Sequence, residues 1–463
     1  MISKLQRLYD ALPLAAQGLA IRLASWRIQR QRFGAEFHAA LREFERLDGA
    51  SPDEVRADQE RRLQEAVQDA ARHVPYYREL FRREGIDPSS IRRVEDLVQI
   101  PPLARETLRT QPEALISEAV PKREQLEGRT SGSTGTALRL VHTREALAAE
   151  YAAAWRQRGR YGLHLGDRFA AFGGRAVVPL SQTQPPFWRF DPVRQRTLYS
   201  LYHMSPENLD AYCADLAKPG HRFWQGYPSS IAWIASHLLE KQIDLGDAGP
   251  TAIFTSSESL LDSQRQRISL ATGAPIADRY ANSELCVSIS EHPDGAYRVD
   301  TEVCAVEIDA RESGDGWVRG EILATGFANR AMPLIRYRTG DIATLRDAVG
   351  GAARPVVEAI DGRIEDYVVT PDGRRVGRMD HAFKDTPGLR EAQILQHDRD
   401  SIRVLLVPIE SFGKQARAVV EAELRSRLGH HIAIEFEIVE NIPRLPNGKF
   451  RAVISEVGKI DVP

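Results

Sequence analysis

Residues 129–140 read RTSGSTGTALRL, and eight of these twelve residues are Gly, Ser, Thr or Ala. The segment lies between a charged stretch, PKREQLEG, and a helix-forming stretch, TREALAAEYAAAW. Glycine lets the backbone approach phosphate oxygens closely, and Ser and Thr add hydroxyl donors to the backbone N–H groups. The usual P-loop spacing is missing, because no Gly-Lys-Ser/Thr follows. By itself the segment is compatible with a phosphate-binding loop or with an ordinary surface turn.

The composition is that of a globular chain with a large core. A length of 463 residues predicts more than one domain, and 42% of the residues are hydrophobic. The formal net charge of −2 argues against nucleic acid as the main partner, because phosphate-backbone binding needs a clustered basic excess. Three scattered cysteines, Cys213, Cys286 and Cys304, cannot form a disulfide framework. We therefore expect a reducing compartment and a cytoplasmic location. The oligomeric state is left open.

No window approaches 18 consecutive apolar residues, so we find no transmembrane span. The N-terminal segment LPLAAQGLAIRLASW is the one stretch that suggests a signal peptide, but Gln17 and Arg22 interrupt its apolar residues and no clean small-residue cleavage site follows. We predict a structural helix here and no integral membrane segment. A helix lying on a membrane surface is the open alternative, because Arg22, Arg27, Arg30 and Arg32 lie within or just after the apolar stretch.

The order of patterns along the chain predicts an α/β protein with a small α+β addition. Residues 1–75 read as helical, and Ser51 and Glu54 have capping-box spacing. From about residue 165, strand-like and helix-like stretches alternate, which predicts mixed or parallel sheets covered by helices. After residue 361 a hairpin, a strand, a helix and another strand follow. The predicted division is a helical N-terminal region at 1–100, a core domain at 101–361 and a C-terminal α+β domain at 362–463.

Four further pieces accompany the Gly/Ser/Thr segment. They are YANSE at 280–284, YRTGD at 337–341, DGRIED at 361–366 and PRLPNGK at 443–449. In this order and spacing the five pieces resemble the signature set of adenylate-forming enzymes, which include acyl-CoA ligases, adenylation domains and luciferases. Residues 73–103 resemble the N-terminal part of the phenylacetate–CoA ligase-like branch. The early LPLAAQGLA and RIQRQRFG stretches and GYPS at 226–229 resemble its capsular polysaccharide biosynthesis-associated subgroup.

The resemblance implies how a triphosphate is held while a carboxylate attacks its α-phosphate and pyrophosphate leaves. Glu284 is placed like the magnesium-binding glutamate, and a hard oxygen ligand suits Mg²⁺. Lys449 is placed like the lysine that moves in to contact the carboxylate and α-phosphate, and Arg363 like an arginine near the ribose and phosphates. Catalytic roles are therefore expected for Lys449, Glu284 and Arg363. The residues expected to hold the β and γ phosphates are Thr130, Ser131, Gly132, Ser133, Thr134, Gly135 and Thr136.

The same resemblance implies the rest of the nucleotide and substrate sites. Asp341 is expected to accept hydrogen bonds from both ribose hydroxyls. Tyr280 is a candidate to stack on adenine, although an aromatic residue at a strand end can equally belong to the core. The remaining nucleotide contacts are expected from Ser257, Glu258, Ser259, Asn282 and Ser283. The acyl pocket is expected from Gly173, Tyr227, Pro228, Ser229 and Ala281.

Two features concern movement and metal content. In these enzymes the C-terminal domain rotates between the two half-reactions, and Glu365 occupies the hinge position, where Asp or Lys is usual. Many relatives of this branch have a Cys-x-Cys pair after the YRTGD motif as part of a structural zinc site. Here that stretch reads RDAVGGAARP. Cys286, His292 and Cys304 are irregularly spaced and lack a fourth ligand, so we expect no zinc.

Three functions remain open from the sequence. The first is an ATP- and Mg²⁺-dependent, AMP-forming ligase that joins a small carboxylic acid, aromatic or not, to CoA. The second uses the same adenylate but transfers the acyl group to an amine of a sugar or metabolite. The third is a non-catalytic nucleotide-binding protein on the same fold. The retained Glu284, Asp341, Arg363 and Lys449 argue against the third.

Overall fold

The structure is a computed structural model of the 463-residue chain. It describes residues 8–129, 138–174, 176–346, 354–363, 367–376, 379–383, 386, 388–409, 412–445 and 448–457. Contacts divide the chain into two compact units. The first comprises residues 1–167, 191–195 and 277–360, and the second comprises 168–190, 196–276 and 361–463. The three-part domain division remains a prediction.

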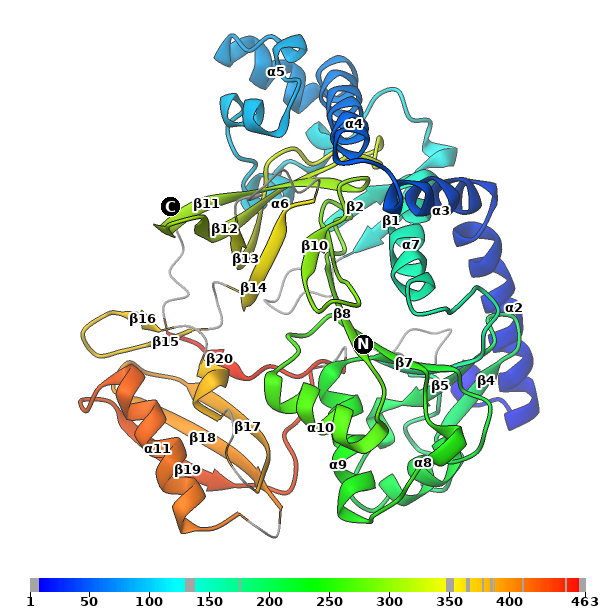
Figure 1. Ribbon diagram of the computed structural model, residues 1–463, viewed down its shortest axis with the longest axis vertical. Helices are drawn as coiled ribbons and strands as arrows, with labels where there is room; N and C mark the ends of the chain where they lie inside the picture. The colour runs from blue at the N-terminus through cyan, green and yellow to red at the C-terminus, as the bar shows by residue number, and fades with distance from the viewer. Residues whose placement is uncertain are drawn as a thin grey trace. The chain divides into compact units, whose positions relative to one another are not determined.

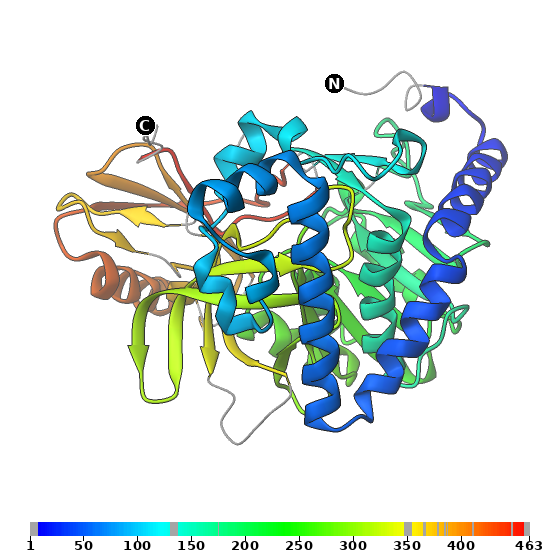
Figure 2. The same cartoon turned by 90° about the horizontal axis from the view of Figure 1, so that it is seen from above.

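The first unit begins with a series of helices, drawn in blue in Figures 1 and 2. They are α2 (Leu14–Arg32), α3 (Ala35–Asp48), α4 (Pro52–His73) and α5 (Pro75–Glu84). The predicted capping box is confirmed at the start of α4. The Glu54 N–H donates to Ser51 Oγ at 3.4 Å, and the Ser51 N–H donates to Glu54 Oε2 at 2.8 Å. Short helices follow: η1 (Pro88–Ser90), η2 (Val94–Gln99), α6 (Arg105–Thr110), η3 (Pro112–Leu115) and η4 (Lys122–Glu124).

The sheet of the first unit has the strand order β11-β12-β13-β14-β10-β9-β8. Its strands are β8 (Ile276–Ala281), β9 (Ser288–Glu291), β10 (Tyr297–Val299), β11 (Cys304–Gly314), β12 (Trp317–Gly326), β13 (Tyr337–Arg346) and β14 (Val356–Arg363). A separate antiparallel hairpin, β1 (Leu126–Arg129) and β2 (Arg139–His142), precedes α7 (Arg144–Gly159). Apolar side chains of α4, α5, β9, β11 and β12 form one continuous core. That core fixes the strands that carry YANSE and YRTGD.

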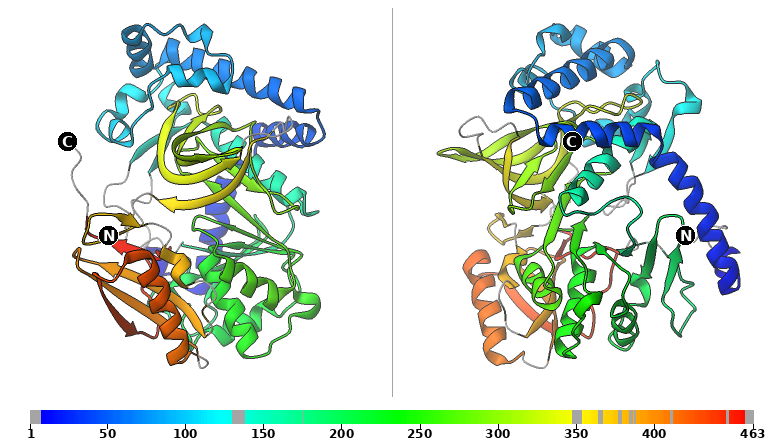
Figure 3. Two further views of the ribbon diagram at one scale, coloured as in Figure 1. Left: turned by 60° about the vertical axis from the view of Figure 1, so that its left-hand side comes forward. Right: turned by 45° about the vertical axis from the view of Figure 1, so that its right-hand side comes forward.

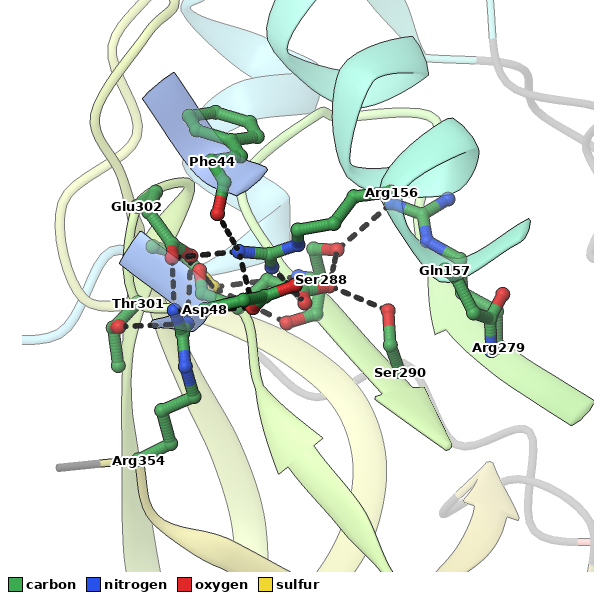
Figure 4. Close-up of polar contacts among 12 residues, drawn as sticks. Phe44, Asp48, Arg156, Gln157, Arg279, Ser288, Ser290, Thr301, Glu302 and Arg354 are labelled. Carbon is green, nitrogen blue, oxygen red and sulfur yellow. Dashed lines mark hydrogen bonds and ion pairs between the residues drawn. The ribbon is translucent and has the colours of Figure 1, made fainter. Parts of the chain in front are cut away.

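Charged groups are also buried in the first unit (Figure 4). The guanidinium of Arg156, on α7, is 1% exposed and lies 2.6 Å from both Asp300 Oδ1 and Glu302 Oε1. Arg354 Nη1 donates to Glu302 Oε2 at 2.8 Å, and Ser290 donates to Asp300 at 2.7 Å. The arginines hold the pKa of the Glu302 carboxyl well below its usual range despite burial. This ion cluster ties α7 to the segment between β10 and β11.

The second unit contains the predicted parallel sheet. Its strand order is β7-β6-β3-β5-β4, and β5, β3, β6 and β7 run parallel to one another. The strands are β3 (Phe169–Gly173), β4 (Trp188–Asp191), β5 (Arg196–Ser200), β6 (Phe223–Gly226) and β7 (Ala252–Ser256). The helices are η5 (Leu201–His203), α8 (Leu209–Leu216), α9 (Pro228–Glu240), η6 (Gly246–Ala248) and α10 (Asp262–Thr272). The alternation of strands and helices predicted for residues 165–280 is confirmed.

The C-terminal part of the second unit is the predicted α+β arrangement (Figure 3). The hairpin expected in YVVTPDGRRV is present as β15 (Val368–Val369) and β16 (Arg375–Val376). The other elements are η7 (Met379–Phe383), β17 (Leu389–Gln396), β18 (Ser401–Pro408), α11 (Lys414–Leu428), β19 (Ala433–Ile438) and β20 (Val453–Ser455). The sheet order is β19-β18-β17-β20, and Val420, Leu424 and Leu428 of α11 join its core. The predicted fold class is therefore confirmed.

Candidate active site

The β1–β2 hairpin holds the base of the Gly/Ser/Thr segment. Residues 126–129 pair with 139–142, so Arg129 and Arg139 face each other where the segment leaves and rejoins the hairpin. The expected phosphate-binding residues 130–136 lie outside the described residues. Asn329 anchors the hairpin, because its Nδ2 donates at 3.0 Å to the carbonyls of Val141 and Met332. The ends of the segment are thus set by an ordered pair of strands.

His142, the last residue of β2, was not singled out from the sequence. Its side chain is buried, its Nδ1 lies 3.3 Å from Asn329 Nδ2, and its ring hydrogen-bonds the backbone of Ser283. His142 therefore connects the base of the phosphate-loop hairpin to the YANSE motif. Gly128 leaves room for the ring, since a Cβ there would lie 3.1 Å from His142 Nε2. A lone histidine before a helix carries no sequence signal for this contact.

Burial makes His142 a source of acid sensitivity. Desolvation lowers the pKa of its imidazole to about 4, whereas an unfolded histidine titrates near 6.5. The unfolded chain therefore binds a proton first as the pH falls. The stabilisation is complete above pH 6.5 and is lost progressively between pH 6.5 and 4. Linkage puts the loss at about 3 kcal/mol.

We expect His142→Gln to remove the share of one histidine from the pH dependence of the free energy of unfolding across that window, measured by urea denaturation. His221 and His292, whose pKa values desolvation also lowers to about 4, keep their own shares. The glutamine amide can still accept from Asn329 and donate to Ser283 but does not titrate. His164→Gln, at an exposed position, should retain the wild-type pH dependence. An unchanged pH dependence in His142→Gln would contradict the assignment.

Glu284, the last residue of the YANSE motif, contacts polar groups from two other elements of the first unit. Its carboxylate is buried and Oε1 accepts a hydrogen bond from the Tyr337 hydroxyl at 3.2 Å. Arg105 Nη1, at the start of α6, lies 3.7 Å from the same oxygen. Arg105 was not identified from the sequence, because it belongs to none of the five pieces. The arginine partly balances the buried carboxylate.

Tyr280 and Asp341 meet across the first unit. The Tyr280 hydroxyl donates to Asp341 Oδ2 at 2.6 Å, and burial, followed by the charge of Asp341, raises the pKa of the tyrosine. Asp341 follows Gly340, whose φ of +79° allows the turn within β13. Its backbone N–H donates to Thr339 Oγ1 at 3.1 Å. The tyrosine expected at the base and the aspartate expected at the ribose are thus adjacent.

The YANSE turn is held by its own polar groups. Asn282 Oδ1 accepts from the Cys286 N–H at 3.2 Å, and the φ of Leu285 is +55°, a conformation that leucine rarely adopts. This places buried Glu284 between half-buried Ala281 and Asn282 and the start of β9. Ser283 is exposed. Local backbone strain of this kind often accompanies functional turns.

In the second unit, the predicted substrate and adenine residues lie at one edge of the parallel sheet. Gly173 ends β3, and Tyr227 and Pro228 follow β6. Residues 257–259 follow β7; Ser257 and Ser259 are exposed, and Ser257 has a φ of +73°. Carboxyl ends of parallel strands share an edge, which is where ligands bind in open α/β sheets. The fold thus brings together residues that the sequence separates by 86 positions, from 173 to 259.

The PRLPNGK segment reaches this same edge. A Cβ on Gly448 would lie 3.0 Å from the Gly174 Cα and 3.8 Å from Tyr227 Cε2. The Phe450 N–H donates to Glu258 Oε1 at 2.6 Å, and the Ser229 N–H donates to Oε2 of the same carboxylate at 3.3 Å. Desolvation raises the pKa of Glu258. Half-buried Lys449 lies between these contacts, so residues 448–450 are held against the segments that follow β3, β6 and β7.

Arginines fix the C-terminal part against the helices of the second unit. Arg444 pairs with Glu391, and its guanidinium lies 4.9 Å from the Phe450 ring. Arg267, on α10, donates to the carbonyl of Leu389 at 3.1 Å. Only Arg444 lies in a recognisable motif, so sequence reasoning missed these contacts. The Arg444–Phe450 contact joins residues on the two sides of Lys449.

A cavity of about 470 Å³ borders the same region, lined among others by Arg267, Glu391 and Phe450. None of its lining residues belongs to the predicted nucleotide or acyl sites. The cavity therefore lies outside the predicted acyl site.

Two predicted residues cannot be placed fully. Arg363 ends β14, and only its backbone is described, while the proposed hinge Glu365 lies outside the described residues.

Cys286 and Cys304 are buried in one core, where desolvation raises the pKa of both thiols. Over the described ranges, no group of three His, Cys, Asp or Glu side chains is arranged to hold a metal. The absence of zinc stays a prediction. Among the described helices, none has the length and apolar character needed to cross a bilayer.

The similarity to known proteins covers nearly the whole chain and not only these motifs. The CapK C-terminal domain family matches residues 368–456. Protein CapK of Staphylococcus aureus is 25% identical over 463 residues, covering 98% of this chain and 100% of CapK. The phenylacetate–coenzyme A ligase of Aromatoleum evansii is 24% identical over 405 residues, which cover 80% of this chain and 84% of the ligase. A solved 2-hydroxyisobutyryl-CoA ligase in complex with 2-HIB-AMP has a TM-score of 0.67 at 20% identity. The match covers 86% of this chain and 89% of the ligase chain.

The chain is homologous to the phenylacetate–CoA ligases and shares the fold of an acyl-CoA ligase, which confirms the resemblance to the adenylate-forming enzymes. Within that branch it is homologous to CapK along nearly its whole length. The capsule-associated resemblance is therefore confirmed as well.

Proposed function

We propose that this chain is an ATP-dependent, AMP-forming carboxylate ligase. It adenylates a small carboxylic acid, with aromatic acids among the candidates, and transfers the acyl group to CoA. Homology to phenylacetate–CoA ligases supports the adenylating reaction. ATP, Mg²⁺ and CoA are the proposed cofactors, and the three buried free thiols are in keeping with the proposed cytoplasmic location.

The observation that carries the proposal is the contact of the PRLPNGK segment with the carboxyl edge of the parallel sheet. The Phe450–Glu258 hydrogen bond and the approach of Gly448 to Gly174 and Tyr227 hold the Lys449 backbone beside the proposed acyl and adenine residues. An ammonium on a long stem there could balance charge that develops between a carboxylate and the α-phosphate. This supports a role for the Lys449 cation beside the proposed acyl and adenine residues.

In this proposal the other residues bind and orient. Asp341, fixed by the Tyr280 hydroxyl, accepts from the ribose hydroxyls. Residues 130–136 donate to the β and γ phosphates, and Arg363 contacts the ribose and phosphate region. The C-terminal part, residues 362–463, rotates about Glu365 between the half-reactions.

The Glu284 carboxylate, whose Oε1 lies 3.7 Å from Arg105 Nη1, would supply one oxygen ligand to a magnesium ion. Mg²⁺ takes oxygen ligands and uses only one or two carboxylates, with phosphates and water completing its shell. Glu284 is a buried carboxylate beside the Tyr337 hydroxyl. When bound, the ion neutralises phosphate charge.

We expect Glu284→Gln to lower the adenylation rate by about 10²-fold and to raise the magnesium concentration needed for half-maximal rate. The amide keeps the shape and the contact with Tyr337 but loses the charge. Glu435→Gln, at an exposed position of β19, is the matched control and should behave as wild type. A normal magnesium dependence in Glu284→Gln would remove this residue from the metal site.

The function is tested by carboxylate-dependent exchange of labelled pyrophosphate into ATP across aromatic, aliphatic and amino acids. Exchange with a subset of acids is the expected result and identifies the acid. ATP binding without exchange, for every acid in a panel spanning these classes, would favour the non-catalytic alternative.

A second candidate differs only in the acceptor. Full-length similarity extends to CapK, whereas the match to the A. evansii CoA ligase covers 80% of this chain. Because the similarity to CapK covers 98% of this chain, the amine of a sugar or metabolite that the capsule-associated resemblance implies is tested beside CoA. Incubating each active acid with CoA or with amines, and following product mass, separates thioester from amide formation.

A further inference from the structure

The outer side of α2 is apolar where a surface helix is normally polar. Leu19, Leu23 and Trp26 are 58%, 62% and 54% exposed. Their spacing of four and three residues places them in one row along the helix. The opposite side is attached to the first unit, where buried Ser25 donates to Asp191 and Arg32 contacts Tyr151 of α7. Figures 1 and 3 show α2 at the outside of the first unit.

Arginines surround this row. Arg22 and Arg27 are exposed and lie on its two flanks, and Arg30 continues the row, with its guanidinium 4.5 Å from the Trp26 ring. The sequence has no Asp or Glu between residues 11 and 35, and residues 1–35 contain six Lys or Arg against one Asp. The whole chain has a net charge of −2, so the remaining residues are acidic overall. Positive charge is therefore concentrated beside the exposed apolar row.

We propose that α2 docks this protein on the surface of an anionic lipid bilayer. The leucines and the indole insert at the boundary between headgroups and acyl chains, and the arginines bind lipid phosphates. Long arginine side chains can extend from a buried backbone to the headgroups, and tryptophan favours the interface because its ring is apolar with one polar N–H. The helix lies in the plane of the surface and does not cross it.

Charge decides between this partner and a second copy of the chain. A symmetric dimer through α2 would bring the same patch from both copies together. Arg22, Arg27 and Arg30 of one copy would then lie near the same arginines of the other copy. Such like-charge contact is unfavourable, whereas a surface of lipid phosphates is complementary.

The test is sedimentation of the full chain with vesicles of phosphatidylcholine alone or with added phosphatidylglycerol. We expect binding to the anionic vesicles that weakens with salt, and little binding to the neutral ones. Leu19→Gln/Leu23→Gln should lower the partition coefficient about tenfold or more by removing apolar burial. Arg22→Gln/Arg27→Gln should lower it about tenfold at low salt only.

Leu180→Gln, at a leucine that is 57% exposed elsewhere in the chain, should bind like wild type. Trp26→Phe should remove a blue shift of tryptophan emission that vesicles cause in the wild type. Because all substituted side chains are exposed, the urea midpoint should not change. Equal binding to neutral vesicles, no vesicle binding, or a dimer that Leu19→Gln/Leu23→Gln dissociates would each overturn the proposal.

Discussion

Lys449→Ala is expected to lower the rate of pyrophosphate exchange by roughly 10²–10³-fold, which is the usual cost of removing a group that stabilises transition-state charge. The backbone of Lys449 is held by Gly448 against Gly174 and by the Phe450 N–H on Glu258. Neither contact uses the lysine ammonium. Alanine should therefore remove the cation and leave the segment in place.

Three measurements make this result specific. The urea midpoint of Lys449→Ala should equal that of wild type, which separates lost catalysis from lost folding. Lys414→Ala removes an exposed lysine at the start of α11 and should exchange normally. Thioester or amide formation from a supplied acyl-adenylate should be less affected than exchange, since the lysine is proposed to act in the first half-reaction. A near-normal exchange rate in Lys449→Ala would remove the residue from the mechanism.

Arg156→Met should cause the largest loss of stability, about 3–5 kcal/mol. Methionine fits the length of the buried stem but leaves Asp300 and Glu302 without the guanidinium that contacts both at 2.6 Å. Arg354 still pairs with Glu302, so Asp300 is the carboxylate left most exposed to the desolvation cost. Because domains are stable by only about 5–15 kcal/mol, this loss is a large fraction of the total.

Urea denaturation at neutral pH measures the effect. Arg46→Met provides the control, since Arg46 forms an exposed pair with Glu43 at 2.9 Å and its loss should leave the midpoint unchanged. Arg156→Lys should be intermediate, because lysine keeps the charge but cannot donate to both carboxylates as a planar fork. A loss below about 1 kcal/mol in Arg156→Met would show that the cluster is not a net support of the first unit.

Local signals predicted many elements correctly. The capping box at Ser51 and Glu54, the Pro-Asp-Gly turn between β15 and β16, and the amphipathic α11 depend on residues within a few positions of one another. Such interactions are written into a short window of sequence. The alternation of strands and helices between 165 and 280 likewise follows from periodicity alone.

Contacts between distant residues could not be predicted. Tyr337 reaches Glu284 across 53 positions, and the Phe450 backbone reaches Glu258 across 192. Arg105 and His142 lie in no motif and gained their places beside Glu284 and Ser283 only when the chain folded. A buried charge takes whatever partner the packing brings within reach, and no spacing in the sequence specifies that partner.

The local elements, the charged helix α2 and the chemical groups available for adenylation could all be predicted from the sequence. Helix caps, turns and periodicity act over neighbouring residues, so they can be read before the fold is known. Three contacts could be seen only in the tertiary structure. The Phe450 N–H donates to Glu258, the Tyr280 hydroxyl donates to Asp341, and Arg156 is buried between two carboxylates. These outcomes depend on desolvation and packing of groups far apart in the chain, which exist only in the folded protein.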